Sequence, residues 1–106
     1  MSLCFFDDEK KNKRWSSGVK TAGLEVLCVS QFTLYASLKG NKLDFHKSLE
    51  ASKSKEMYDK LLSMMKEQYE VEKIKDGLFG AMMDVNIVND GPVTLQIECE
   101  NGEKVQ

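Results

Sequence analysis

The 106-residue sequence has one histidine, three widely spaced cysteines and no Cys-x-x-Cys pair. This set does not support a zinc site, because structural zinc needs about four cysteine or histidine ligands at short spacings. The glycine-rich phosphate-binding motifs and the GxSxG nucleophile motif are also absent, so their enzyme classes receive no support. We therefore expect neither a metal nor a cofactor.

Long hydrophobic runs are absent as well. No run approaches the ~18 residues that cross a bilayer, so no membrane partner is expected. Residues 1–8 turn acidic and lack the basic region of a secretory signal. The sequence has one proline, contains neither a linker nor an internal repeat, and suits a single domain over residues 1–106. We expect a cytoplasmic protein.

The sequence has little excess charge of either sign, since 15 Lys and Arg against 17 Asp and Glu give a formal net charge of −2. A broad nucleic-acid clamp has a strong basic excess, so a DNA partner is not expected. A small footprint on one end of an RNA is compatible with this charge, because a few local lysines are enough for it.

Residues 52–70 have the clearest periodic pattern. Apolar side chains recur every four residues from Met57 to Tyr69, which predicts a helix. A serine near its start, Ser52 or Ser54, is the expected N-cap.

Strand patterns occupy three further stretches, so the predicted class is α/β. In the second stretch, β-branched and aromatic residues favour strand over helix. In the third, two alternating runs flank a turn, which predicts a hairpin. The stretches are residues 3–6, 24–36 and 82–98, and the expected connections are residues 7–23 and 37–51.

Polar side chains interrupt the second predicted strand at its end, where Ser30, Gln31 and Thr33 surround Phe32. In α/β proteins, groups that contact ligands gather at strand ends. The alternative, which the pattern alone favours, is that the strand leaves the core and its side chains meet water.

The turn at residues 89–92 also has two interpretations. A cis bond between Gly91 and Pro92 would aim two successive carbonyls in a direction that a trans chain cannot reach. An ordinary trans turn is the alternative, and the low frequency of cis bonds favours it.

His46 lies in a basic loop and is a candidate phosphate contact or proton carrier. The alternative is an inert surface histidine, which is the commoner case.

Four motifs follow one another along the chain: VSQFTL at 29–34, KGNKLDFH at 39–46, GLFGAMM at 77–83 and NDGPVT at 89–94. Their order and separations closely resemble those of D-aminoacyl-tRNA deacylases of the eukaryotic type, which are chiral-proofreading enzymes. The resemblance extends from about Leu3 to Glu98. It implies an α/β fold with a mixed, barrel-like β-sheet core and helices packed on one side.

The resemblance implies a homodimer that hydrolyses the ester between a D-amino acid and the terminal adenosine of tRNA, and also glycyl-tRNA mischarged on tRNA-Ala. In this family the Phe32 N–H would stabilise the developing oxyanion, while Ser30, Gln31 and Thr33 shape the catalytic site. The RNA 2′-hydroxyl would assist in place of a general base. Thr33 as a nucleophile ranks lower, because a threonine without a nearby base is a poor one.

The same resemblance makes Lys39, Lys42 and His46 the expected tRNA contacts, beside the alternative that the lysines only confer solubility. It also implies that Gly91 and Pro92 form a cis dipeptide that reaches into the partner subunit's pocket. Two fixed carbonyl oxygens there would face the α-carbon of the amino acid. The side chain of an L-residue would overlap them, whereas hydrogen would not, so selection works by exclusion.

Two departures from the family stand out. Leu43 occupies a position where relatives usually have proline. The family's opening strands and first helix have no counterpart, including an arginine that braces the Gly-Pro turn, and we expect a truncation or a gene-model start. The alternative function is therefore an impaired fragment that binds the tRNA end or serves as a dimerisation module. Uncovered strand edges and faces also predict marginal stability.

Overall fold

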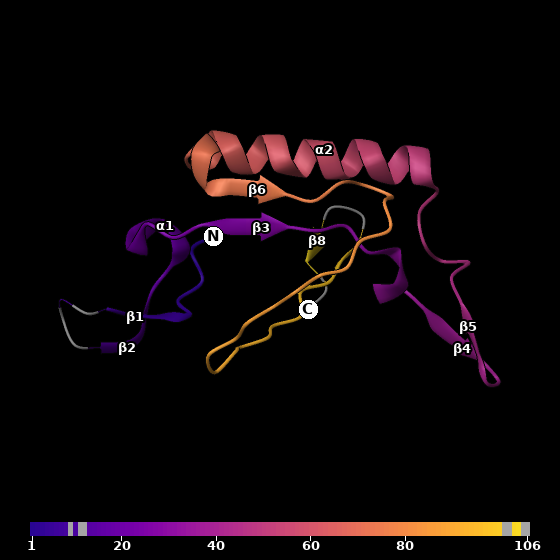
Figure 1. Ribbon diagram of the computed structural model, residues 1–106, viewed down its shortest axis with the longest axis horizontal. Coiled ribbons are helices and arrows are strands. Elements are labelled where there is room, and N and C mark those ends of the chain that lie inside the picture. Colours follow the sequence, from indigo (N-terminus) through magenta and orange to yellow (C-terminus); the bar gives the residue numbers. More distant parts are fainter. Residues whose placement is uncertain (9, 11–12, 101–102, 105–106) are drawn as a thin grey trace.

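A parallel strand pair with its crossover helix forms the centre of the molecule. The computed structural model describes residues 1–8, 10, 13–100 and 103–104. Strands β3 (Val26–Cys28) and β6 (Ile74–Asp76) pair in parallel, with Val26 opposite Ile74. Parallel strands need a long connection, which the helix α2 (Ala51–Gln68) supplies. Figure 1 shows α2 running alongside β6.

The helix predicted over residues 52–70 is confirmed as α2. The helix packs against β6 through Leu62, whereas Met57 and Leu61 of the predicted stripe are exposed. Leu62 and Ile74 are the only buried hydrophobic side chains among the described residues. On the exposed side, the Lys55 ammonium lies 2.9 Å from the Asp59 carboxylate, one turn further along. Packing against β6 therefore stabilises the helix more than its surface charges do.

The predicted serine cap is wrong. Because α2 begins at Ala51, Glu50 occupies the N-cap position and makes no side-chain cap hydrogen bond. Both serines fall inside the first turn, where a hydroxyl finds closer partners. Ser54 Oγ donates to the Ala51 carbonyl at 3.0 Å, and Ser52 Oγ donates to the Glu50 carboxylate at 3.2 Å.

The other elements are short. No helix in the described part of the chain is long and apolar enough to cross a membrane. The remaining strands pair only as antiparallel ribbons, β1 with β2, β4 with β5 and β7 with β8. The bounds are β1 (Phe6–Asp8), β2 (Lys13–Ser17), α1 (Val19–Ala22), the 3-10 helix η1 (Phe32–Leu34), β4 (Ser37–Lys39), β5 (Lys42–Asp44), the 3-10 helix η2 (Val71–Lys73), β7 (Cys99–Glu100) and β8 (Glu103–Lys104).

Both expected connections contain structure that the sequence pattern did not predict. Residues 7–23 include β2 and α1, and residues 37–51 include the β4–β5 hairpin, which turns at Gly40. These ribbons have no covered apolar face, so they lack the alternation that signals a strand. In β2 the backbone of Trp15 also adopts a left-handed φ of 56°, which interrupts regular strand geometry.

All three predicted strand regions differ from the structure. The strand expected over 3–6 is displaced to β1, which shares only Phe6 with it. The strand expected over 24–36 extends only over β3 before the chain turns into η1. Residues 82–98 form two extended arms that reverse near Gly91, but neither arm is a strand (Figure 1). The alternating pattern is present, yet no neighbouring sheet pairs with the arms among the described residues. The hairpin prediction is therefore wrong for this structure.

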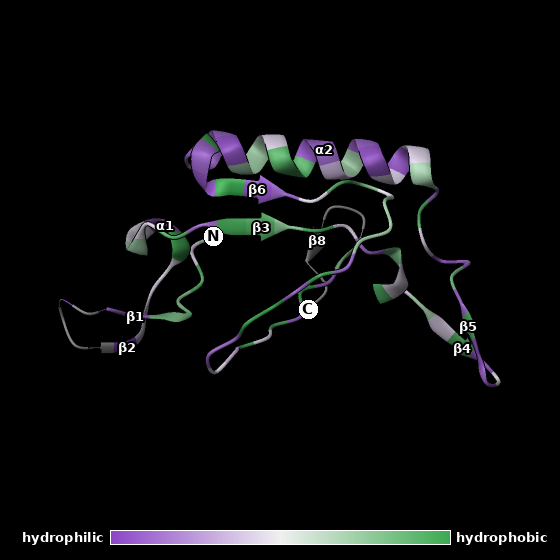
Figure 2. Ribbon diagram, viewed as in Figure 1, coloured by the Kyte–Doolittle hydropathy of each residue, from purple (hydrophilic) through white to green (hydrophobic). Residues whose placement is uncertain are grey.

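The barrel-like core is also not observed. The strands in the described ranges form four separate two-stranded sheets. The accessible surface is 9573 Å², whereas a compact monomer of this size exposes about 6,000 Å². The radius of gyration is 16.3 Å, against about 13 Å for a compact domain. The mixed α/β class is confirmed, and much apolar surface is uncovered, including Leu27 of β3. Figure 2 shows β3 as a hydrophobic strand.

We predict that the isolated chain unfolds with an enthalpy well below the ~70 kcal/mol that a compact domain of this length requires. The reason is that so few side chains leave water. Differential scanning calorimetry, together with binding of a dye for exposed apolar surface, measures this. One sharp transition of ordinary enthalpy without dye binding contradicts the prediction.

Candidate functional site

The predicted catalytic stretch lies where β3 leaves the parallel pair and the chain turns into η1. Ser30 is half-buried, whereas the Phe32 side chain is exposed. The Gln31 side-chain amide donates a hydrogen bond to the Thr33 hydroxyl, so the two polar side chains hold each other. Phe32 opens η1, where amide N–H groups have no acceptor inside the helix. This amide is therefore available to a ligand.

A serine from the segment before α2 fixes the far side of this turn. The Ser48 hydroxyl lies 3.2 Å from the carbonyl oxygens of both Phe32 and Tyr35, and donates to one or the other. The Phe32 ring also packs edge-on against Phe45, with ring centroids 5.1 Å apart. Side chains from another part of the chain therefore hold a segment that lies outside the sheet.

A cavity of about 660 Å³ opens beside this turn, and we call it the Ser30 cavity. Ser30, Gln31 and Phe32 line one side of it, but Thr33 does not line it. The loop at residues 78–83 forms the other wall, and it belongs to the GLFGAMM motif, to which the sequence analysis assigned no role. The other lining residues are Tyr35, Ser48, Leu49, Ala51, Ser54 and Tyr58.

Tyr58 joins the two walls. Its hydroxyl donates to the Cys28 carbonyl at 2.8 Å, and the Gly77 N–H donates to the same carbonyl at 3.2 Å. Its ring lies 5.8 Å from the ring of Phe79 in the opposite wall. Desolvation, and then the negative charge of Asp76, raise the pKa of the Tyr58 phenol, so it stays protonated and able to donate.

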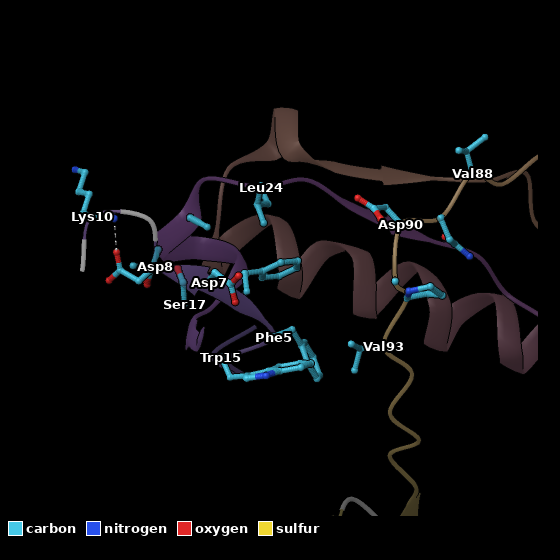
Figure 3. A pocket seen from close by; sticks show the side chains of 16 residues that line it. Phe5, Asp7, Asp8, Lys10, Trp15, Ser17, Leu24, Val88, Asp90 and Val93 are labelled. Atoms are coloured by element: carbon cyan, nitrogen blue, oxygen red, sulfur yellow. Dashed lines mark hydrogen bonds between the residues drawn. The ribbon is translucent and has the colours of Figure 1, made fainter. Parts of the chain in front are cut away.

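Gly91 and Pro92 line a different cavity, of about 1050 Å³, which we call the Gly91 cavity. Figure 3 shows Phe5 and Trp15 on one side of it and Val93 on the other. The two halves of the predicted site are therefore not brought together within one chain.

The expected cis bond is not observed. The described residues contain no cis peptide, so the Gly91–Pro92 bond is trans. Trans is the more stable isomer unless the surroundings impose the other one. Nothing crowds this turn, because a side chain added at Gly91 would meet no atom within 4 Å. The prediction of a cis dipeptide is wrong for this structure.

The three predicted tRNA-binding residues share the β4–β5 hairpin and the residues after it. Lys39 and Lys42 are opposite one another at its tip, and His46 is exposed. None of them lines the Ser30 or the Gly91 cavity. The His46 N–H and ring Nδ1 contact the two carboxylate oxygens of Asp44 at 3.1 and 2.6 Å. These bonds, the backbone one first, lower the pKa of Asp44.

Sequence reasoning missed Tyr58 and Ser48 as parts of the site. Tyr58 follows the helical pattern and looks like a core residue, although a buried phenol needs a hydrogen-bond partner. Ser48 lies in a loop and has no pattern at all. Within the described ranges, no group of three His, Cys, Asp or Glu side chains is arranged to hold a metal ion.

The chain matches a protein-family model and is similar to curated proteins with the same kind of name. Residues 1–98 match the family model described as D-Tyr-tRNA(Tyr) deacylase. The chain is 51% identical over 98 residues to a D-aminoacyl-tRNA deacylase of Drosophila melanogaster, covering 92% of this chain and 61% of that protein. It is 47% identical to D-aminoacyl-tRNA deacylase 1 of Homo sapiens, covering 46% of that protein.

A solved structure titled c-Myc DNA Unwinding Element Binding Protein is also similar. It superposes with a TM-score of 0.85 at 46% identity, covering 93% of this chain and 66% of that one. The chain thus spans about half to two thirds of the length of these proteins.

We predict that the Asp44 carboxyl protonates at a lower pH than an aspartate in an unstructured peptide. Its folded pKa is lowered, so its contribution to stability is complete above the ordinary value and is lost as the pH falls through the folded value. A carboxyl-carbon NMR titration measures the shift. The variant His46→Ala keeps the backbone N–H, so its titration moves only part of the way back. Full return to the ordinary value contradicts the backbone as the main cause.

Proposed function

Because the chain belongs to the D-Tyr-tRNA(Tyr) deacylase family, we propose that it hydrolyses the ester that joins a D-amino acid to the terminal adenosine of tRNA. The observation that carries this proposal is the grouping of Ser30, Gln31 and Phe32 along one wall of the Ser30 cavity. A volume of about 660 Å³ is within the usual range for small-ligand sites. It suits the end of a charged tRNA.

The reaction requires few groups from the protein. Water adds to the ester carbonyl carbon, and the carbonyl electrons move onto its oxygen. The Phe32 N–H donates to that oxyanion. The bond from carbon to the ribose oxygen then breaks, the ribose oxygen takes up the proton that water loses, and the D-amino acid leaves. The neighbouring 2′-hydroxyl of the RNA assists, because no side-chain base lines the cavity within the described residues.

The two walls of the Ser30 cavity would contact different parts of the substrate. The apolar loop at residues 78–83, with Phe79 and Met83, provides surface for the flat adenine base. Ser30 and Gln31 provide polar groups for the ribose and the ester. Thr33 acts by holding Gln31 rather than by attacking the ester.

We propose that the working form is a homodimer in which Gly91 and Pro92 of one copy complete the site of the other. Two observations support this. The two residues line a cavity separate from Ser30 in the same chain. The surface also exceeds that of a compact monomer by about 3,600 Å². An obligate interface buries about 1,000–2,500 Å² on each partner, so a second copy would cover part of this excess. Main-chain atoms of the turn would then exclude an L-side chain, while glycine on tRNA-Ala would pass.

The hairpin residues Lys39, Lys42 and His46 are the proposed contacts for phosphates of the acceptor stem. Their exposure lets them approach an RNA without entering the cavity. Aminoacyl-tRNA is the proposed partner, and the cytoplasm is the proposed compartment, because charged tRNA is used there.

A second candidate function is a non-catalytic module that binds the tRNA end or pairs with a full-length subunit. It is favoured by the separation of Ser30 from Gly91 in one chain.

We predict that the chain hydrolyses D-Tyr-tRNA at least about tenfold faster than L-Tyr-tRNA, a difference of about 1.4 kcal/mol in activation free energy. Release of labelled amino acid at equal enzyme concentration measures both rates. Loss of both esters at the uncatalysed rate, with tRNA-end binding retained, supports the binding module instead. Equal enzymatic rates contradict chiral selection.

We predict that Pro92→Ala lowers the ratio of D to L hydrolysis by about tenfold, because the turn loses its fixed φ and its main-chain atoms move. The matched control is Lys39→Ala, which weakens binding of both esters and leaves the ratio unchanged. Thermal melts of the two variants establish that both are folded. A folded Pro92→Ala variant with an unaltered ratio rules out Gly91 and Pro92 as the selecting element.

A further inference from the structure

Two tyrosine hydroxyls, one from α2 and one from the residue that caps it, bind carbonyls at the end of β3 and just before its start. Tyr58 in α2 donates to the carbonyl of Cys28, the last residue of β3, at 2.8 Å. Tyr69, the C-cap residue of α2, has an extended backbone and donates to the Leu24 carbonyl at 2.9 Å. Leu24 lies two residues before β3 begins.

The two hydrogen bonds have different surroundings. The Tyr69 bond lies at the α1 end of β3, near Val19, whose carbonyl is 3.4 Å from the same hydroxyl. The Tyr58 bond lies at the end that leads to the candidate site, two residues before Ser30. There, Cys28 is the last residue of β3 before the chain leaves the sheet. Whatever fixes its peptide also fixes the direction in which the catalytic stretch begins.

The Cys28 carbonyl accepts a second hydrogen bond, and this limits what removal of the Tyr58 hydroxyl can do. The Gly77 N–H also donates to the Cys28 carbonyl, at 3.2 Å. This carbonyl therefore keeps a partner when the Tyr58 hydroxyl is removed, and the penalty for an unpaired buried group does not arise. Without the Tyr58 hydroxyl, one of the two hydrogen bonds that orient the Cys28 carbonyl is lost. The carbonyl keeps the bond from the Gly77 N–H, but its direction is less restrained.

The Tyr58 ring adds a contact with the opposite wall. It lies 5.8 Å from the Phe79 ring at an interplanar angle of 35°. One side chain thus touches the start of the catalytic stretch through its hydroxyl and the facing loop through its ring. Tyr58 therefore links the two walls, in addition to the bond from the Gly77 N–H to the Cys28 carbonyl.

We propose that Tyr58 is a positioning residue that sets the orientation of residues 30–33 in the Ser30 cavity through its hydrogen bond to Cys28. The link to catalysis rests on the proposed deacylase function, whereas the link to local order does not. Tyr58 acts on the backbone that holds the oxyanion donor and takes no part in bond making or breaking. Its loss lowers turnover more than substrate binding, because a small misplacement of a donor weakens transition-state contacts most.

The test compares Tyr58→Phe with Tyr69→Phe, since each removes one tyrosine hydroxyl that donates to a backbone carbonyl, of Cys28 in the first case and of Leu24 in the second. Hydrogen–deuterium exchange followed by mass spectrometry measures local opening at residues 30–34 and at residues 19–26. Thermal melts measure global stability, and steady-state kinetics with D-Tyr-tRNA give kcat and KM separately.

For Tyr58→Phe we expect at least about fivefold faster exchange at residues 30–34. We also expect about a tenfold lower kcat, with KM within twofold of the parent. For Tyr69→Phe we expect faster exchange at residues 19–26 only, with both kinetic constants within twofold. Similar effects of both variants on residues 30–34, no effect of either, or failure of Tyr58→Phe to fold would overturn the proposal.

The two proposals fail in different ways. An inactive parent protein defeats the deacylase function, while the exchange pattern still decides whether Tyr58 orders residues 30–34. An active parent with equal kinetics in both variants defeats the positioning role and leaves the deacylase function standing.

Discussion

The contact between α2 and the β3–β6 pair is the interaction on which the rest of the structure depends. It buries Leu62 and Ile74, and it brings together strands that are far apart in sequence. The same helix places Tyr58 against the end of β3, where the candidate catalytic stretch begins. This layer therefore orders the start of the candidate site, while Ser48 and Phe45 hold its far side.

The division of the candidate site between two cavities has a direct physical meaning. Ser30 and its neighbours face one cavity, and Gly91 and Pro92 face another. In a single copy the candidate catalytic stretch and the Gly91–Pro92 turn are therefore apart. Under the proposed function, stereochemical selection depends on association with a second copy.

Sequence reasoning predicted the parts of the fold that bury an apolar stripe. The α2 helix follows from the spacing of Met57, Leu61 and Tyr69, and the turn at Gly40 follows from its residue types. The ribbons β1–β2 and β4–β5 were missed because exposed strands have no hydrophobic alternation. Residues 82–98 have the alternation but no partner to pair with, so a correct local pattern gave an incorrect element.

The site was predicted in part for similar reasons. Resemblance of motifs located Ser30, Gln31 and Phe32, which the structure gathers at one cavity. It did not locate Ser48 or Tyr58, because a residue that supports a backbone carbonyl has no sequence signature of its own. The isomer at Pro92 also differs, since peptide-bond geometry depends on what surrounds the turn.

The parallel pairing of Val26 with Ile74 has a kinetic consequence. Nearly half of the chain separates the two residues. The entropy of closing this loop is lost before the strand contacts can contribute any stabilising free energy. Because helices form within about a microsecond, α2 is formed early and becomes the surface on which both strands assemble. During that interval the apolar strand β3 is unpaired. The speed of synthesis and the supply of chaperones therefore bear on the yield of folded molecules as much as the final contacts do.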